Sequence, residues 1–99
     1  MLSTNMEDFE PEEFREMQQM YVNHTLNELS NIIKEENIES LRTFGHNIKG
    51  SGGMYGYDSI SEIGSIIEQA ALSNNYSIIK SNLAELNILL TNIKLQEKF

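Results

Sequence analysis

The spacing of apolar residues is the feature that most restricts the fold of this chain. From Pro11 onward, apolar side chains recur every three or four positions, which is the period of an amphipathic α-helix. No segment shows the alternation that is typical of a β-strand. The pattern falls into four segments with short joins, and four helices with one apolar face each must bury these faces together. The sequence therefore predicts an all-α fold, an antiparallel four-helix bundle.

Signals for helix ends place the four segments along the chain. Pro11 stands among glutamates, as is typical of a first helical turn, and the helix that it opens is expected to end near Lys34. Asn37 is a suitable N-cap for the second helix. Ser59 lies three residues before a glutamate, the spacing of a capping box that would open the third helix. A turn at residues 73–75 leads into the fourth helix.

The 99 residues fit a single domain over residues 1–99, with its core at about residues 10–95 and a short acidic lead-in before the first helix. The residues expected to face inward are spaced for burial along the four helices: Phe14, Tyr21, Val22, Leu26, Leu29, Ile32, Ile33, Leu41, Phe44, Ile48, Ile60, Ile63, Ile67, Ala70, Tyr76, Ile79, Leu83, Leu86, Leu90 and Ile93.

Charge and composition exclude several classes of function. The chain carries 15 acidic and 7 basic side chains, a formal net charge of −8, which repels nucleic-acid phosphates and anionic lipids. Cysteine is absent and only two histidines occur, so neither disulfides nor a structural zinc cluster are expected. The N-terminus has no signal-peptide pattern and no apolar run is long enough to span a membrane. We expect a cytoplasmic protein without a nucleic-acid or membrane partner.

Residues 41–56 depart from this composition, because they hold five of the six glycines and no acidic residue. On a helix, with about 100° per residue, the apolar residues of this segment form one stripe that must face the core. The opposite side carries two cations, an imidazole and two glycines: Arg42, His46, Lys49, Gly50 and Gly53. This pattern predicts a histidine on the solvent side of the helix, beside positive charge and bare backbone.

The glycines leave two interpretations of where this helix ends. Each one costs a helix interior about 0.8–1 kcal/mol relative to alanine, so the helix could stop at Gly50 with residues 51–53 as a loop. Alternatively, the helix continues and a bulky partner must approach His46 closely. Met54 and Tyr55 favour continuation, because large apolar residues have little reason to stand in a loop.

Residues of these types suit phosphoryl transfer. Neutral imidazole is a nucleophile near neutral pH, and it forms a phosphoramidate with an activated phosphoryl group. Because negative charge gathers on the phosphoryl oxygens, Lys49 and, more weakly, Arg42 would supply neutralising positive charge. Gly50 and Gly53 would leave room for the active site of a partner.

At residues 46–56, which read His-Asn-Ile-Lys-Gly-Ser-Gly-Gly-Met-Tyr-Gly, the sequence resembles the signature of histidine phosphotransfer (Hpt) domains of two-component phosphorelays. Residues 61–64 and 67–71 are similar to the helix that follows this signature in bacterial members. The resemblance covers nearly the whole chain.

The resemblance implies a role for each residue of the signature. His46 would accept the phosphoryl group, and Lys49 would neutralise its charge. Gly50 would permit close approach of the partner, and Gly56 would form the turn into the next helix. The glycines at residues 52–53 are denser than in the signature, and they could shorten the helix and change which receivers fit.

The implied function is a phosphoryl carrier without kinase activity of its own. It would exchange phosphoryl groups with the aspartate of a receiver domain, on a response regulator or a hybrid sensor kinase. No cofactor is expected on this chain, since Mg²⁺ would be bound by the partner's receiver domain. We expect a freestanding monomer that works in trans.

A non-phosphorylated helical module that docks a receiver or kinase is the alternative, although the intact histidine, lysine and glycine set favours the carrier. An ATP-using kinase does not fit, because nothing resembles a nucleotide-binding lobe. His24 is expected to be an ordinary surface residue, and Arg42 could simply pair with Glu39. Met20 points away from the core, so it either helps to dock a partner or is an isolated exposed residue.

Overall fold

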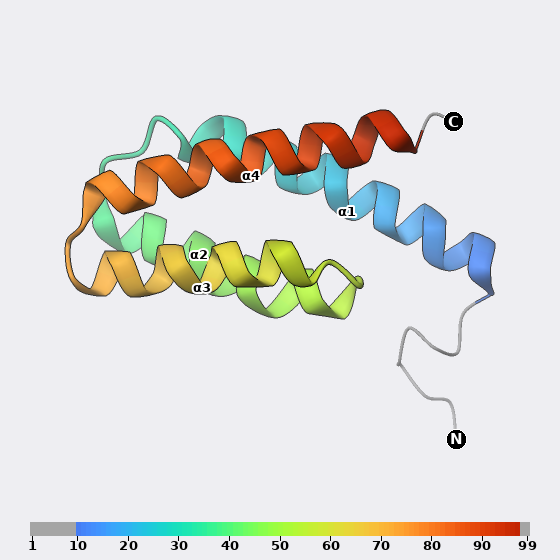
Figure 1. Ribbon diagram of the computed structural model, residues 1–99, viewed down its shortest axis with the longest axis horizontal. Coiled ribbons are helices and arrows are strands. Elements are labelled where there is room, and N and C mark those ends of the chain that lie inside the picture. Colours follow the sequence, from blue (N-terminus) through green and yellow to red (C-terminus); the bar gives the residue numbers. More distant parts are fainter. Residues whose placement is uncertain (1–9, 98–99) are drawn as a thin grey trace, which may run out of the picture.

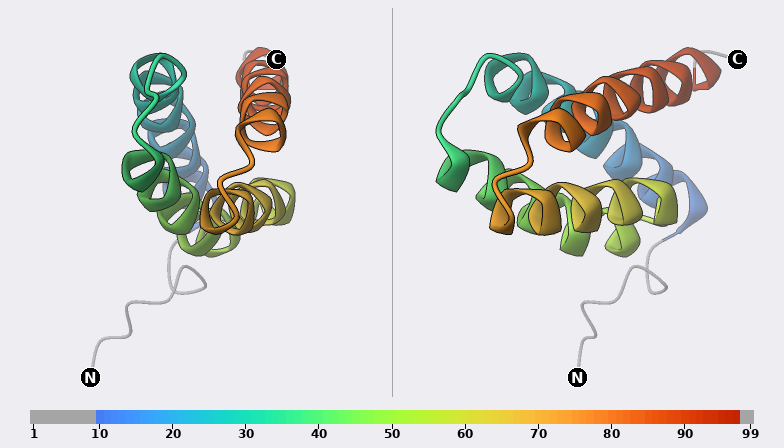
Figure 2. Two further views of the ribbon diagram at one scale, coloured as in Figure 1. Left: turned by 90° about the vertical axis from the view of Figure 1, so that its left-hand side faces the viewer. Right: turned by 60° about the vertical axis from the view of Figure 1, so that its left-hand side comes forward.

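The computed structural model describes residues 10–97, which form four helices joined by short turns. These are α1 (Pro11–Ile32), α2 (Ile38–Met54), α3 (Asp58–Leu72) and α4 (Tyr76–Gln96). Successive helices run in opposite directions (Figure 1), and seen end-on they stand at the corners of a bundle (Figure 2). The predicted all-α four-helix bundle is confirmed, and residues 10–97 contain no strand. None of these helices is long and apolar enough to cross a membrane.

Two of the predicted helix starts, those of α1 and α2, are confirmed. Pro11 is the first residue of α1, and Glu10 of the predicted acidic lead-in is its N-cap, while Glu7 and Asp8 lie outside the described residues. The side chain of Asn37 accepts a hydrogen bond from the Glu39 backbone N–H at 2.9 Å, so it caps α2 as predicted.

The predicted capping box at Ser59 is wrong. Gly56 has a φ of +85°, in the left-handed region that favours glycine, and it forms the tight turn after α2 that the family resemblance implies. The turn is so short that Tyr57 already occupies the N-cap position and α3 begins at Asp58. Ser59 therefore lies inside the first turn of α3.

The core fills the space between the four helices. Its buried members are Tyr21, Val22, Leu29, Leu41, Phe44, Ile48, Ile60, Ile67, Ala70, Ala71, Ile79, Leu83, Leu86 and Leu90. Two residues predicted to face inward do not, since Ile33 is 39% exposed and Tyr76 is 41% exposed. Both lie at helix ends, where the helical period no longer decides which side is covered. Tyr76 instead donates its hydroxyl to the Glu36 carbonyl at 2.6 Å.

A lysine from α4 caps the C-terminal end of α1, which has no basic residue in its own last turn. Nζ of Lys80 donates to the carbonyl oxygens of Ile33 at 3.2 Å and Glu35 at 3.0 Å. A cation in this position satisfies free carbonyls and interacts favourably with the helix dipole. Lys80 therefore ties the connection between α1 and α2 to α4.

Replacing Lys80 tests how much these hydrogen bonds contribute to the stability of the fold. Lys80→Met should lower the free energy of unfolding by about 1 kcal/mol, because it removes charge-assisted hydrogen bonds at a partly exposed site. Chemical denaturation followed by circular dichroism measures the change. Lys94→Met, at an exposed position in the last turn of α4, is the control and should cost roughly 0.3 kcal/mol. Equal losses in the two variants would show that Lys80 makes no specific contribution.

Candidate functional site

The helix α2 continues through the glycine-rich segment and ends only at Met54. The predicted continuation is confirmed, whereas a loop at residues 51–53 or a helix shortened by its glycines is wrong. The burial of Met54 is not the reason, because this residue is 59% exposed. Instead, the ring of Tyr55 stacks on the ring of Tyr21 from α1, with centroids 4.5 Å apart, and this contact holds the end of α2 in place.

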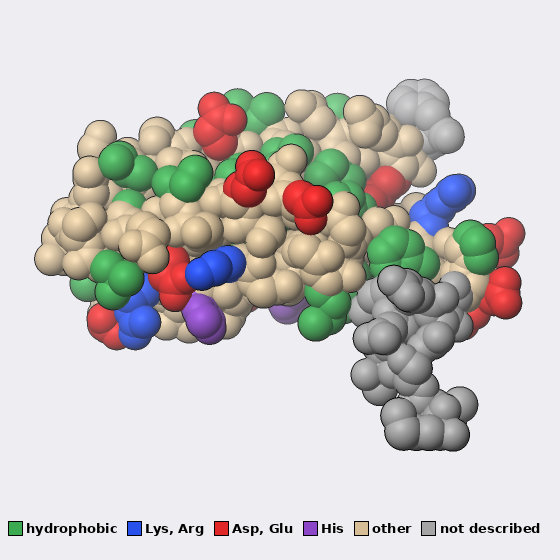
Figure 3. All heavy atoms as spheres, turned by 60° about the horizontal axis from the view of Figure 1, so that its bottom comes forward, with side chains coloured by type: hydrophobic (Ala, Val, Ile, Leu, Met, Phe, Trp, Pro, Cys, Tyr) green, Lys and Arg blue, Asp and Glu red, His purple; other side chains and the backbone are tan. Residues whose placement is uncertain are grey.

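The outward face of α2 carries the predicted histidine and lysine. The side chain of His46 is 67% exposed and that of Lys49 is 48% exposed. A Cβ atom added at Gly50 or Gly53 would have no neighbour within 4 Å among residues 10–97. Figure 3 turns the α2–α3 side forward and shows a histidine at the surface beside basic and acidic side chains. The imidazole is exposed to solvent next to glycines, where no side chain of the described residues covers the helix backbone, as the sequence predicts.

A carboxylate that the sequence pattern did not indicate completes the site. Oε2 of Glu68, on α3, lies 2.8 Å from Nδ1 of His46, and Oε1 lies 3.5 Å from Nζ of Lys49. The Glu68 side chain is only 13% exposed, far less than its two partners. Residues 41–56 contain no acidic residue, but the neighbouring helix supplies one. The only sequence signal near Glu68 is the family resemblance of residues 67–71, which does not say what this side chain contacts.

This carboxylate determines the state of the imidazole. An ionised carboxylate can only accept a hydrogen bond, so the short contact places the proton of a neutral His46 ring on Nδ1. Nε2 then keeps its lone pair, and it has no hydrogen-bond partner among residues 10–97. The arrangement presents a nucleophilic nitrogen on the open face of α2, with the positive charge of Lys49 nearby.

A second set of glycines packs α2 against α3. Gly45, Gly52 and Gly64 are buried, and a Cβ atom at any of them would come within 3 Å of the facing helix. We call these three residues the glycine seam. The expectation that Gly52 adds to a helix-shortening cluster is therefore wrong, because this residue lets two helix backbones approach. The seam lets α2 and α3 pack with their backbones close together.

The fold and this exposed imidazole agree with one protein family. The model of the family described as "Hpt domain" matches residues 12–96. The chain belongs to the Hpt domain family. Hpt domains are helical phosphocarrier modules of phosphorelays, where they interact with receiver domains and kinases. No curated protein and no solved structure matches the chain.

The other residues singled out from the sequence form no hydrogen bond or ion pair with the histidine, lysine and glutamate of the site. Arg42 pairs with Glu39 at 3.0 Å within α2, which is the ordinary role considered for it. Met20 is 70% exposed on α1 and points away from the core, as predicted. His24 is an exposed residue that lies 3.3 Å from Glu28, one turn further along α1.

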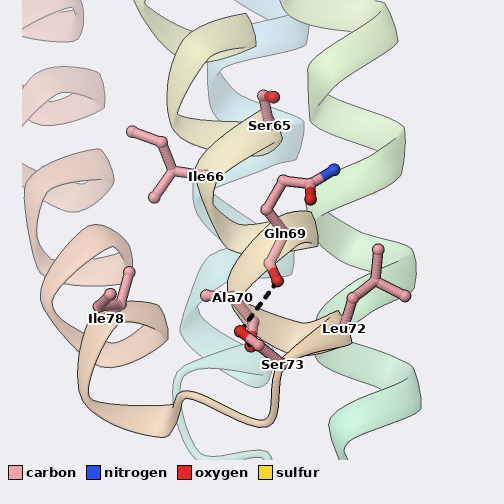
Figure 4. Close-up of a pocket in the computed structure, with 7 residues that line it drawn as sticks. All are labelled: Ser65, Ile66, Gln69, Ala70, Leu72, Ser73 and Ile78. Atoms are coloured by element: carbon pink, nitrogen blue, oxygen red, sulfur yellow. Dashed lines mark hydrogen bonds between the residues drawn. The ribbon is translucent and has the colours of Figure 1, made fainter.

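A hollow of about 530 Å³ between α3 and α4 is separate from this site (Figure 4). It is lined by Ser65, Ile66, Gln69, Ala70, Leu72, Ser73 and Ile78, none of which is charged. Its walls therefore offer neither an imidazole nor a cation to a phosphoryl group. No cluster of His, Cys, Asp and Glu within the described part of the chain could hold a metal ion.

The contact between Glu68 and His46 has a measurable consequence. The hydrogen bond from His46 lowers the pKa of Glu68, with Lys49 adding to this effect and burial opposing it. A carboxyl group with a lowered folded-state pKa stabilises the fold above its unfolded-state pKa, and this stabilisation is lost as the pH falls through the folded-state value.

We expect a ¹³C NMR titration to show Glu68 becoming protonated at a lower pH in the wild-type protein than in a His46→Ala variant. His24→Ala is the control and should leave the Glu68 titration unchanged. Identical curves for the wild-type and His46→Ala proteins would mean that the imidazole does not hold this carboxylate.

Proposed function

We propose that this Hpt domain accepts a phosphoryl group on Nε2 of His46 and passes it to or from the aspartate of a receiver domain in a phosphorelay. One observation carries the proposal: Glu68 holds Nδ1 at 2.8 Å on an imidazole that is 67% exposed. This arrangement leaves the other ring nitrogen as the nucleophile and turns it toward a partner. Membership of the Hpt family supports the same conclusion.

In the transfer step, the lone pair of Nε2 attacks the phosphorus of an aspartyl phosphate on the receiver. The N–P bond forms as the P–O bond to the aspartate breaks, and the aspartate leaves as a carboxylate with the bonding electrons. The proton on Nδ1 stays between the ring and Glu68, whose negative charge stabilises the positive charge that the ring acquires. The reverse step uses the same path, and the proposed role is that of a phosphoryl carrier without kinase activity of its own.

Lys49 provides positive charge for the phosphoryl oxygens. Its Nζ lies 3.5 Å from Glu68, a loose contact that leaves ammonium donors free for phosphate. The same contact offsets repulsion between Glu68 and the incoming phosphoryl group. In this proposal, Mg²⁺ is bound by the partner's receiver domain and the Hpt domain needs no cofactor of its own.

The open backbone of α2 lets the receiver cover the imidazole. Gly50 and Gly53 lie on the outward side, where no atom of the described residues comes within 4 Å of the position of a Cβ atom, so the partner's active site has room to approach. Arg42 and the exposed Met20 are proposed to lie at the edges of the docking surface. The proposed carrier is a monomer that acts in the cytoplasm.

Removal of the nucleophile tests the proposal. His46→Gln should abolish phosphoryl acceptance, because glutamine has no nucleophilic ring nitrogen. Receiver domains loaded with labelled acetyl phosphate and Mg²⁺ serve as donors, and autoradiography of gels follows the label. His24→Gln is the matched control and should accept label at the wild-type rate. Label on the His46→Gln protein would overturn the proposal, and a wild-type protein that binds receivers without taking label would favour the non-phosphorylated module.

Placing a large side chain at Gly50 tests whether the receiver domain docks over this part of α2. Gly50→Leu should raise the receiver concentration for half-maximal transfer roughly tenfold, because the new side chain stands in the path of the partner. Leucine favours a helix more than glycine does, so α2 itself should not weaken. Asn87→Leu, at an exposed position of α4, is the control. A wild-type concentration dependence for Gly50→Leu would mean that the partner does not cover this part of α2.

A further inference from the structure

We infer that Gly45 and Gly64 are positioning residues, which hold Glu68 at hydrogen-bonding distance from His46 and so determine which imidazole nitrogen is free to react. This inference rests on the proposed function of His46, and it gives a functional reason for the close packing of α2 on α3. Both glycines belong to the glycine seam and both are buried, so their role is exerted inside the domain.

Each of these glycines adjoins the main chain of a residue in the site. A Cβ atom on Gly45, which directly precedes His46, would lie 2.9 Å from the backbone nitrogen of Glu68. A Cβ atom on Gly64 would lie 2.5 Å from the backbone nitrogen of Lys49. The two glycines therefore set the separation of the helices at the level of the site residues.

The hydrogen bond between His46 and Glu68 depends on this separation of the helices. Main-chain atoms inside a helix cannot move aside alone, so a side chain at Gly45 must push the two helices apart. Ordinary contacts of a Cβ atom are 3.4–4 Å, compared with the 2.9 Å available at the Glu68 nitrogen. The hydrogen bond from His46 to Glu68 is 2.8 Å long, and a further separation of about 0.5 Å would bring it close to the limit of about 3.5 Å and so weaken it. Without it, nothing keeps the ring proton on Nδ1.

Two further contacts prevent the helices from compensating by sliding or turning. The Ser61 hydroxyl donates to the Lys49 carbonyl at 2.6 Å, which fixes the register of α3 along α2. Ile67, the neighbour of Glu68, is fully buried in the core. A rotation of α3 that carried Glu68 back toward the imidazole would expose this isoleucine. The position of the carboxylate therefore follows from the helix spacing that the glycines allow.

Phosphoramidate tests the inference without a protein partner, because its P–N bond breaks with loss of ammonia as the bond from phosphorus to Nε2 forms. Gly45→Ala should slow this phosphorylation about tenfold, since small displacements around a reacting atom have effects of this size or more. ¹⁵N NMR should show that the His46 ring proton is no longer confined to Nδ1. Alanine favours a helix more than glycine does, so a weaker α2 cannot be the cause.

A double variant separates positioning from general damage. Glu68→Ala should slow phosphorylation by phosphoramidate about tenfold, as Gly45→Ala does. If Gly45 acts through Glu68, adding Gly45→Ala to the Glu68→Ala protein should change the rate by less than about twofold. Two independent losses that multiply would overturn the inference, as would a Glu68→Ala protein with the wild-type rate.

Gly52→Ala is the matched control within the glycine seam. Its Cβ atom would lie 2.7 Å from the backbone nitrogen of Ser61, two turns of α3 before Glu68. The variant should lose stability, yet its rate should stay within about twofold of the wild type and its Nδ1 proton signal should persist. A loss of rate equal to that of Gly45→Ala would show that crowding anywhere along the seam has the same effect, which would overturn the inference.

Glu68→Asp gives the same test with the glycine seam intact, in case Gly45→Ala does not fold. Shortening the side chain by one methylene opens a gap to Nδ1 of His46 and should also slow phosphorylation about tenfold. A wild-type rate for Glu68→Asp would overturn the inference and leave the proposed function standing. Acceptance of label by His46→Gln would instead overturn the proposed function, so the two failures are distinguishable.

Discussion

The backbones of α2 and α3 approach so closely that only glycine fits at three places between them, Gly45, Gly52 and Gly64. These two helices make the most extensive contact in the bundle, and α1 and α4 lie on the other side of the core from them (Figure 2). The candidate site is a product of this contact, because His46 comes from one helix and Glu68 from the other. A wider helix pair would lengthen the contact on which the chemistry of the imidazole depends.

The glycines of α2 serve two purposes, according to whether they face α3 or lie on the outward side of the helix. Each lowers helix stability by about 0.8–1 kcal/mol relative to alanine. At Gly45 and Gly52 the close packing of α3 offsets this cost, since any side chain would clash there. At Gly50 and Gly53 no contact within the described part of the chain offsets it, because an added Cβ atom would meet nothing there within 4 Å. A glycine that destabilises a helix without improving its packing is expected where a partner needs the space. We propose this role for Gly50 and Gly53.

The site also shows how a strongly acidic protein can receive a phosphoryl group. The chain has a net charge of −8, yet residues 41–56 hold no acidic residue. Among the described residues, the carboxylate that contacts His46 comes from α3. Glu68 is mostly covered, and it is held by His46 and Lys49. Because these partners offset its charge, Glu68 acts on the imidazole more than it repels phosphate.

The sequence by itself determined the four helices, most of the core and the outward direction of His46, because the helical period relates each residue to neighbours three or four positions away. It failed at two helix starts, at Ser59 and Tyr76, because the period decides neither the first residue of a helix nor which side of a helix end is covered. Only the tertiary structure decided that Gly52 packs against a helix and that Glu68 meets an imidazole 22 residues away. Such contacts depend on which helices face each other and at what register, and no local pattern of residues records either.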